Sequence, residues 1–280
     1  DVLAIALVLT AFVGVGRSAG PAGSLVAGGL VAAATSVKFT YAVALLALLL
    51  AGRGVRRALW LLAGWGAVLV VLHLWTGGHV YDQVGRSRGA VSLATPWRLL
   101  LEWSWTSSVG VSTMRSIITV AAGVAMIGLA VLSWRATRPL GGREPSERQG
   151  SLGLARRAAW ITLVLTAAYG LLAPYTLPWY DLVAWGLLPL VVPSVLDGIL
   201  LARLTLIAVA YVPGRVIGMT PGVEALTLGL RREVTPWLQL GLWVVAVTLL
   251  LHTTHRRGRI SDDDGPDGWG HPPAPRRRAR

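Results

Sequence analysis

The chain has 280 residues, of which 54 % are hydrophobic and only 14 % are charged. Soluble domains usually carry about 25 % charged residues, so the composition excludes an ordinary water-soluble domain. The formal net charge is +13, from 26 Lys and Arg against 13 Asp and Glu. The arginines fall mainly between apolar runs, which indicates the positive loops of a membrane protein rather than a nucleic-acid surface. The chain has no cysteine, which excludes disulfides, thiolate nucleophiles and Cys-ligated metals.

Long apolar runs rich in Leu, Ala, Val and Gly predict membrane-spanning helices, because they lack the alternation of a β-barrel. We expect an all-α fold: a polytopic transmembrane helical bundle of about eight membrane segments, with short interfacial helices in the outer loops. The membrane domain should cover 1–255, and the low-complexity tail 256–280 should be disordered. The predicted segments are 2–16, 24–51, 58–75, 117–134, 158–173, 179–193, 195–213 and 234–252.

The beginning of the chain, DVLAIALVLTAFVGVG, lies inside an apolar run and has no charged region before it. This is not the pattern of a signal peptide. The run is shorter than the ~20 residues that a spanning helix needs. We therefore expect further helices upstream in the complete protein.

The loops between the segments predict the orientation. One face collects 16 Lys and Arg, in the loops around Arg53 and Arg138 and in the C-terminal tail. The other face collects 8, including Arg17, Arg98 and Arg115. The positive-inside rule then places the C-terminus and the start of the first segment in the cytoplasm.

The segment 24–51 is too long for one straight span. Its 28 residues would extend about 42 Å against a hydrocarbon core of ~30 Å. Lys38, in TSVKFT, is the expected place of a break, and the segment is then one span or two. A charge at mid-membrane costs ~2.5–3.5 kcal/mol, so Lys38 either faces a cavity, where a phosphate would be a natural partner, or snorkels from a broken helix end.

Two loops of the other face are long. In 76–116, the stretch PWRLLLEWSW predicts a short amphipathic helix that begins at Pro96, with Trp97, Trp103 and Trp105 as interfacial anchors. The loop 214–233 is expected to lie along the membrane surface. Both loops carry arginines.

Two acids of this face are the candidate catalytic residues. Asp82 lies just past a helix end, and Asp181 follows Trp179 and Tyr180 at the start of a helix. Either carboxylate suits a general base. The alternative for Asp181 is an acid stabilised by the helix dipole without a chemical role.

Basic and aromatic side chains complete the candidate site. Guanidinium groups bind phosphate in a bidentate manner, so the outward arginines are candidate ligands of a lipid-linked phosphate; the alternative is contact with lipid head groups. The candidate phosphate-binding residues are Lys38, Arg86, Arg88, Arg231 and Arg232. Trp179 and Tyr180 are candidates for stacking on a sugar, or belong to an interfacial aromatic belt.

Three stretches carry a family resemblance: LVAGGLVAAATSVKFTYAVALLALLL (25–50), SLATPWRLL (92–100) and LAPYTLPWYDLVAWGLLPL (172–190). Together they make residues 20–250 resemble the actinobacterial polyprenyl-phosphate-mannose-dependent α-mannosyltransferases, integral membrane glycosyltransferases of the GT-C class. The resemblance is at family level, without a unique fingerprint.

The resemblance implies transfer of a sugar, expected to be mannose, from a polyprenyl-phosphate donor to a cell-envelope glycan or lipoglycan at the outer face. It implies an inverting reaction with a carboxylate base, which in such enzymes usually lies in the first outer loop, a region expected upstream of this chain. Asp82 is then a substitute candidate for this base, chosen only from its position in the sequence. The family resemblance also implies the cytoplasmic (inner) membrane of a bacterium. The sequence indicates no cofactor or metal site, and either positive side chains or a divalent metal would stabilise the leaving phosphate.

The alternatives are a transporter or flippase of lipid-linked glycans, and a non-enzymatic component of envelope assembly. The candidate polar path of a transporter is Lys38, Asp197 and Arg203. Asp197 and Arg203 lie six residues apart, nearly opposite on one helix, and are not expected to pair with each other.

Overall fold

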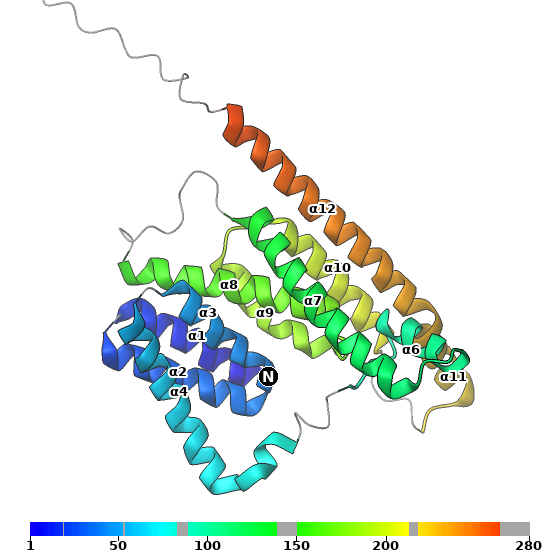
Figure 1. Cartoon of the computed structure of the whole chain (residues 1–280), viewed down its shortest axis with the longest axis horizontal. Helices are drawn as coiled ribbons and strands as arrows, with labels where there is room; N and C mark the ends of the chain where they lie inside the picture. The colour runs from blue at the N-terminus through cyan, green and yellow to red at the C-terminus, as the bar shows by residue number, and fades with distance from the viewer. Residues whose placement is uncertain (19, 53, 83–88, 139–149, 213–217, 264–280) are drawn as a thin grey trace, which may run out of the picture.

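A computed structural model describes residues 1–18, 20–52, 54–82, 89–138, 150–212 and 218–263 (Figure 1). All regular secondary structure in these ranges is helical. The α-helices are α1 (Val2–Arg17), α2 (Pro21–Val37), α3 (Ala42–Ala51), α4 (Val55–Thr76), α6 (Trp97–Thr106), α7 (Val111–Thr137), α8 (Gly150–Leu172), α9 (Leu182–Leu187), α10 (Val195–Ala210), α11 (Pro221–Gly229) and α12 (Thr235–Asp263). Short 3₁₀ turns are η1 (Phe39–Tyr41), η2 (Gly77–Tyr81), η4 (Pro178–Asp181) and η5 (Leu188–Leu190), and η6 (Leu230–Val234) is a π-helical segment.

Three helical stretches are long and apolar enough to cross a membrane: Val55–His79, Val111–Thr137 and Pro221–Arg257. They correspond to the predicted segments 58–75, 117–134 and 234–252. The most apolar window of the first is only 11 % buried inside the protein, so its apolar side chains face outward. Such a surface is typical of a helix in contact with lipid. The all-helical class and the apolar, membrane-type helices are therefore confirmed.

The segment 24–51 is two helices rather than one. α2 ends at Val37, Lys38 is extended with φ −160° and ψ 124°, and α3 begins after one 3₁₀ turn. The break lies at the residue where the sequence predicted it. α3 has only 10 residues, about 15 Å of helix, and is too short to cross a bilayer alone.

The break reverses the chain, which corrects the predicted orientation of α1. Lys38 and Tyr41 both contact Asp1, so the start of α1 and the break lie at the same end of the helices. Residues 25–29 of α2 pack against 61–65 of α4, which places the starts of α2 and α4 together at the opposite end. Arg17 therefore lies with Arg56, not with the loop after α4. If every other Lys and Arg keeps its sequence-predicted face, this change would make the counts 17 and 7 instead of 16 and 8.

The predicted span 179–193 is also not one helix. The helix α9 has only 6 residues between two 3₁₀ turns that each contain a proline, Pro178 and Pro189. Proline lacks the amide hydrogen that continues a helix and clashes with the preceding turn. Pro193 then precedes α10, which has 16 residues where the sequence predicted 195–213.

The helix α8 is the centre of the packing. It contacts α1 and α3 on one side and α7 and α9 on the others. Its buried side chains, including Ile161, Leu163 and Val164, belong to the main apolar core. The helices α7, α10 and α12 pack beside one another and run diagonally through Figure 1. The tail predicted from 256 is still helical to Asp263, and 264–280 lie outside the described residues.

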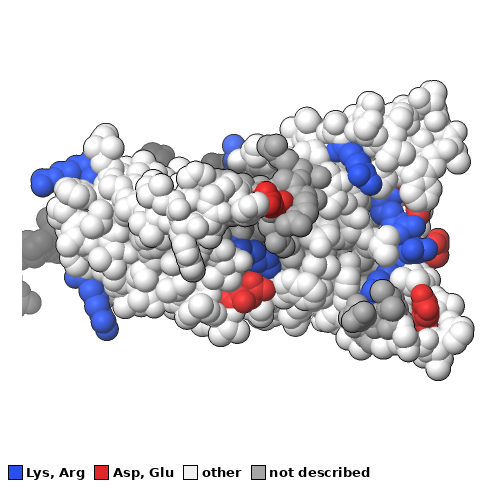
Figure 2. All heavy atoms as spheres, turned by 90° about the horizontal axis from the view of Figure 1, so that it is seen from below, with Lys and Arg blue, Asp and Glu red and all other residues white. Residues whose placement is uncertain are grey.

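Of the short helices predicted in the two long loops, one is present as a separate helix, whereas α11 is continuous with α12 through η6. α6 begins after Pro96 as expected, and Trp103 and Trp105 are exposed. Trp97 is not an interfacial anchor: it is 8 % exposed, packs on Trp243, and donates its indole N–H to the carbonyl of Leu172 at 2.7 Å. α11 lies in the second loop. Figure 2 shows charged side chains at both ends of one face and a small group near its middle, with uncharged surface between them.

Candidate functional site

Lys38 lies where α2 ends and the chain turns into α3. Its amide donates to the carbonyl of Ala34, and its carbonyl accepts from Tyr41. The side chain leaves the apolar helices at their end and is 18 % exposed. Its ammonium lies 3.5 Å from the carboxylate of Asp1 and 3.4 Å from the ring centre of Tyr180, within the range of a cation–π interaction. A break in the helix thus carries a lysine to the helix ends instead of leaving it at mid-membrane.

The residues Trp179, Tyr180 and Asp181 form one 3₁₀ turn and point in different directions. Leu177 is extended and Pro178 starts the turn, which fixes the entry into α9. Trp179 is 48 % exposed, Tyr180 lies under the Lys38 ammonium, and Asp181 is only 3 % exposed. One short turn therefore presents an aromatic side chain to the outside and a carboxylate to the core.

Asp181 forms a buried ion pair with Arg203 of α10. Arg203 is fully buried, and its other guanidinium N–H groups donate to the carbonyl of Gly170 and to the hydroxyl of Thr176, each at 2.6 Å. A Cβ at Gly170 would lie 3.3 Å from the carboxylate of Asp181, so the glycine leaves room for the pair. Buried charges require such a partner and hydrogen bonds, because the desolvation of each ion costs several kcal/mol.

Three tyrosines, Tyr169, Tyr175 and Tyr180, cluster near the ion pair. The ring of Tyr180 lies 6.1 Å from that of Tyr169 and 6.3 Å from that of Tyr175, within the usual spacing of aromatic pairs. The turn before α6 packs here: Ser92 donates its hydroxyl to the carbonyl of Thr176, and Thr95 donates to that of Pro174. We call Lys38, Tyr180, Asp181 and Arg203 the charged corner.

The remaining candidates lie elsewhere. Asp82 is exposed at the end of η2, and its carboxylate is 3.1 Å from Nδ1 of His79. Arg231 is 5 % exposed; its Nε donates to the carbonyl of Ala210, and its guanidinium stacks 4.6 Å from the ring centre of Tyr211. Arg232 is exposed. Arg86 and Arg88 lie outside the described residues.

The structure thus brings together Lys38, Tyr180 and Asp181, which were predicted separately as phosphate-binding, sugar-binding and catalytic residues. Arg231 lies apart from them. The key residue absent from our candidates for the sugar-transfer site is Arg203. The available signal in the sequence was the position of Arg203 inside a mostly apolar run, because a charge in such a run requires a buried partner. Spacing along one helix excluded Asp197 as that partner, but nothing in the sequence selects Asp181 among the acids of other segments.

The described residues hold no group of three or more His, Asp or Glu side chains arranged to bind a metal ion. Comparison with known proteins gives no relative: no family model, no curated protein and no solved structure matches the chain. Any function must therefore be argued from the residues and their geometry.

Proposed function

We propose that this chain is a polytopic integral membrane glycosyltransferase that transfers a sugar from a polyprenyl-phosphate donor at the outer face of a bacterial cytoplasmic membrane. The proposed bundle includes α1–α3 and α8–α10 beside the three long helices. The C-terminus would lie in the cytoplasm, since the 17 Lys and Arg on its face, against 7, follow the positive-inside rule. The charged corner and the loops around α6 and α11 would then lie outside.

The observation that carries this proposal is the position of Lys38. Its ammonium lies at the end of apolar helices, where the phosphate of a lipid-linked donor would lie, and its side chain is partly exposed. The exposed Trp179 and the ring of Tyr180 stand beside it, and aromatic faces stack on sugar rings. A cation next to a leaving phosphate would stabilise the charge that develops on transfer.

The two candidate bases differ in access. A general base must come within hydrogen-bonding distance of the acceptor hydroxyl. Asp181 is buried and paired with Arg203, which suits a positioning residue that fixes Trp179 and Tyr180. Asp82 is exposed beside His79 and is free to meet an acceptor from outside. We therefore assign Asp82 as the accessible candidate base within this chain, which would have to approach the charged corner when substrates are bound, and Asp181 as a positioning residue.

The test is sugar transfer by the intact protein in membranes, from radiolabelled polyprenyl-phosphate mannose to envelope glycans. We expect transfer by the wild type and, for Asp82→Asn, a loss of roughly 100-fold or more, the usual contribution of a general base. Glu224→Gln, which changes another acid of the outer loops, is the matched control and should keep its activity. Absence of transfer by the wild type with varied lipid-linked sugars would overturn the proposal and favour a transporter or a structural component.

A further inference from the structure

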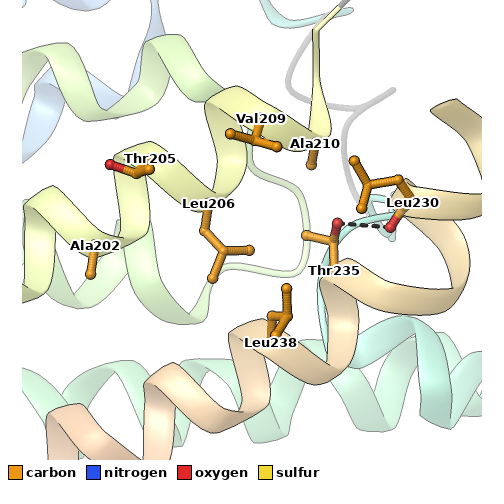
Figure 3. A pocket seen from close by; sticks show the side chains of 8 residues that line it. All are labelled: Ala202, Thr205, Leu206, Val209, Ala210, Leu230, Thr235 and Leu238. Carbon is orange, nitrogen blue, oxygen red and sulfur yellow. Dashed lines mark hydrogen bonds between the residues drawn. The ribbon is translucent and has the colours of Figure 1, made fainter.

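A groove of about 400 Å³ lies between α10 and α12 (Figure 3). In Figure 3, Leu206 of α10 and Leu238 of α12 point toward each other across it. The groove is lined by Ala202, Thr205, Leu206, Val209, Ala210, Leu230, Thr235 and Leu238. From Ala202 to Ala210 it follows about 12 Å of helix, less than half of a ~30 Å hydrocarbon core.

The surface of the groove is that of a hydrocarbon. Its two hydroxyl groups are used within the helices: Thr205 donates to the carbonyl of Leu201 at 2.9 Å, and Thr235 donates to that of Leu230 at 2.8 Å. Both threonines can therefore present their methyl groups without leaving a polar atom unsatisfied. The groove also opens outward, since Val209 and Leu238 are 56 % and 52 % exposed.

Two arginines and one acid, Glu233, lie next to one end of the groove. It ends at Ala210 and Leu230, and the next residues of the π-helical segment are Arg231 and Arg232. Arg231 is fixed by its hydrogen bond to the carbonyl of Ala210, directly at the groove's end. Arg232 is exposed beside it. An apolar channel with guanidinium groups at its surface end is complementary to an amphiphile with an anionic head group.

A π-helical segment lies at one end of the groove. The hydroxyl of Thr235 bonds to the carbonyl five residues earlier, and the extra residue per turn widens the helix at Leu230–Val234. Single π-helical turns occur frequently at functional sites. Here the widened turn places Leu230 and Thr235 on the groove wall and both arginines at its end.

We propose that this groove binds one acyl chain of an anionic membrane phospholipid, whose phosphate is held by Arg232 beside Arg231. The inference is independent of the proposed sugar transfer. A phospholipid is the occupant because the groove opens to the side of apolar helices, follows less than half of the hydrocarbon core, and has an uncharged lining with arginines next to its outer end.

The test is native mass spectrometry of the detergent-purified intact protein with added phosphatidylglycerol or phosphatidylcholine. We expect phosphatidylglycerol to bind more tightly. Arg232→Gln should lower its affinity roughly fivefold, toward that of phosphatidylcholine, because each basic side chain near an anionic lipid contributes an attraction of this size. Arg231 is unsuitable for this test because it holds the carbonyl of Ala210.

A second pair of variants tests the groove itself. Ala202→Phe should fill it and weaken both lipids. Ala67→Phe is the matched control, because Ala67 lines a smaller apolar groove of about 270 Å³ on α4 whose lining residues carry no charge. Unchanged melting temperatures identify variants that fold. Equal binding of the two lipids by the wild type, or equal loss in Ala202→Phe and Ala67→Phe, would overturn the proposal. Displacement of phosphatidylglycerol only by polyprenyl phosphate would reassign the occupant.

Discussion

At the scale of single residues, the ion pair of Asp181 and Arg203 is the most demanding feature of the core. Both side chains are almost completely buried, and Arg203 joins α10 to the end of α8 through Gly170 and to the following loop through Thr176. The pair therefore fixes where the turn with Trp179 and Tyr180 lies. Its removal should affect the charged corner as well as stability.

Replacement of Arg203 by Met should lower the free energy of unfolding by ~3–5 kcal/mol, because the carboxylate of Asp181 would stay buried without its partner. The double variant Asp181→Leu/Arg203→Met should lose less than the single variant, since it buries no unpaired charge. Thermal unfolding in detergent measures both. Asp197→Asn, in the first turn of α10, is the control and should change stability by less than ~1 kcal/mol. If the loss of unfolding free energy in the double variant equals the sum of the losses in Asp181→Leu and Arg203→Met alone, the pairing is contradicted.

The residues of the site were predictable to different degrees. Lys38 stood out because it interrupts an apolar run, and the run's excess length predicted the break. The burial of Asp181 was not predictable, because a helix-start acid looks the same whether it faces water or a distant arginine. Arg203 was noticed, but its partner is set by the packing of α8, α10 and η4, which no local pattern contains.

At the scale of helices, the closest contact is that of α2 with α4. A Cβ on Gly28 would overlap the carbonyl of Leu61, and a Cβ on Gly64 would overlap that of Leu25. Small residues allow helix backbones to approach in membranes, where apolar side chains gain nothing by leaving lipid. The two glycines are therefore necessary for this pair of helices.

Gly28→Ala and Gly64→Ala should each lower stability by about 1–3 kcal/mol, because the added methyl group forces the backbones apart. Gly66→Ala is the matched control on α4: a Cβ there has nothing within 4 Å, so the change should be neutral or slightly stabilising. The measurement is the melting temperature of the three variants in thermal unfolding under the same conditions. Equal melting temperatures for Gly64→Ala and Gly66→Ala would contradict the close packing.

Helix boundaries followed the sequence where apolar runs were long and free of proline. The predicted 117–134 lies within α7, and the predicted amphipathic helix at Pro96 is α6. The prediction failed at 179–193, where hydropathy suggested a span although Pro178 and Pro189 interrupt the backbone hydrogen bonds. Hydropathy reports burial in apolar surroundings and does not distinguish a spanning helix from short turns packed in a core.

At the scale of the whole molecule, the reversal at Lys38 decides which residues share an end. Phe39 is 62 % exposed next to Lys38, and Trp179 is exposed on the same side. Arg17 and Arg56 lie at the opposite end, near the starts of α2 and α4. The sequence-based topology placed Arg17 on the same face as the α4–α6 loop. That topology treated 24–51 as a single span, and a second span there reverses the orientation of α1.

The absence of cysteine makes this arrangement easy to test. Single cysteines at Phe39, Trp179, Arg17 and Arg56 can be labelled in intact cells with a membrane-impermeant maleimide. We expect the cysteines at Phe39 and Trp179 to react from outside, and those at Arg17 and Arg56 to react only after the membrane is opened. Labelling of Arg17→Cys from outside would support the single-span topology and contradict the reversal.

The central claim is that Lys38 binds the donor phosphate at the outer end of the helices. Its most direct measurement is sugar transfer in membranes by wild type, Lys38→Arg and Lys38→Met, at several concentrations of polyprenyl-phosphate mannose. Charge loss in Lys38→Met should reduce transfer roughly 100-fold, as the removal of one group that stabilises developing charge does. Lys38→Arg should restore part of it. Equal transfer by all three folded proteins would contradict the claim.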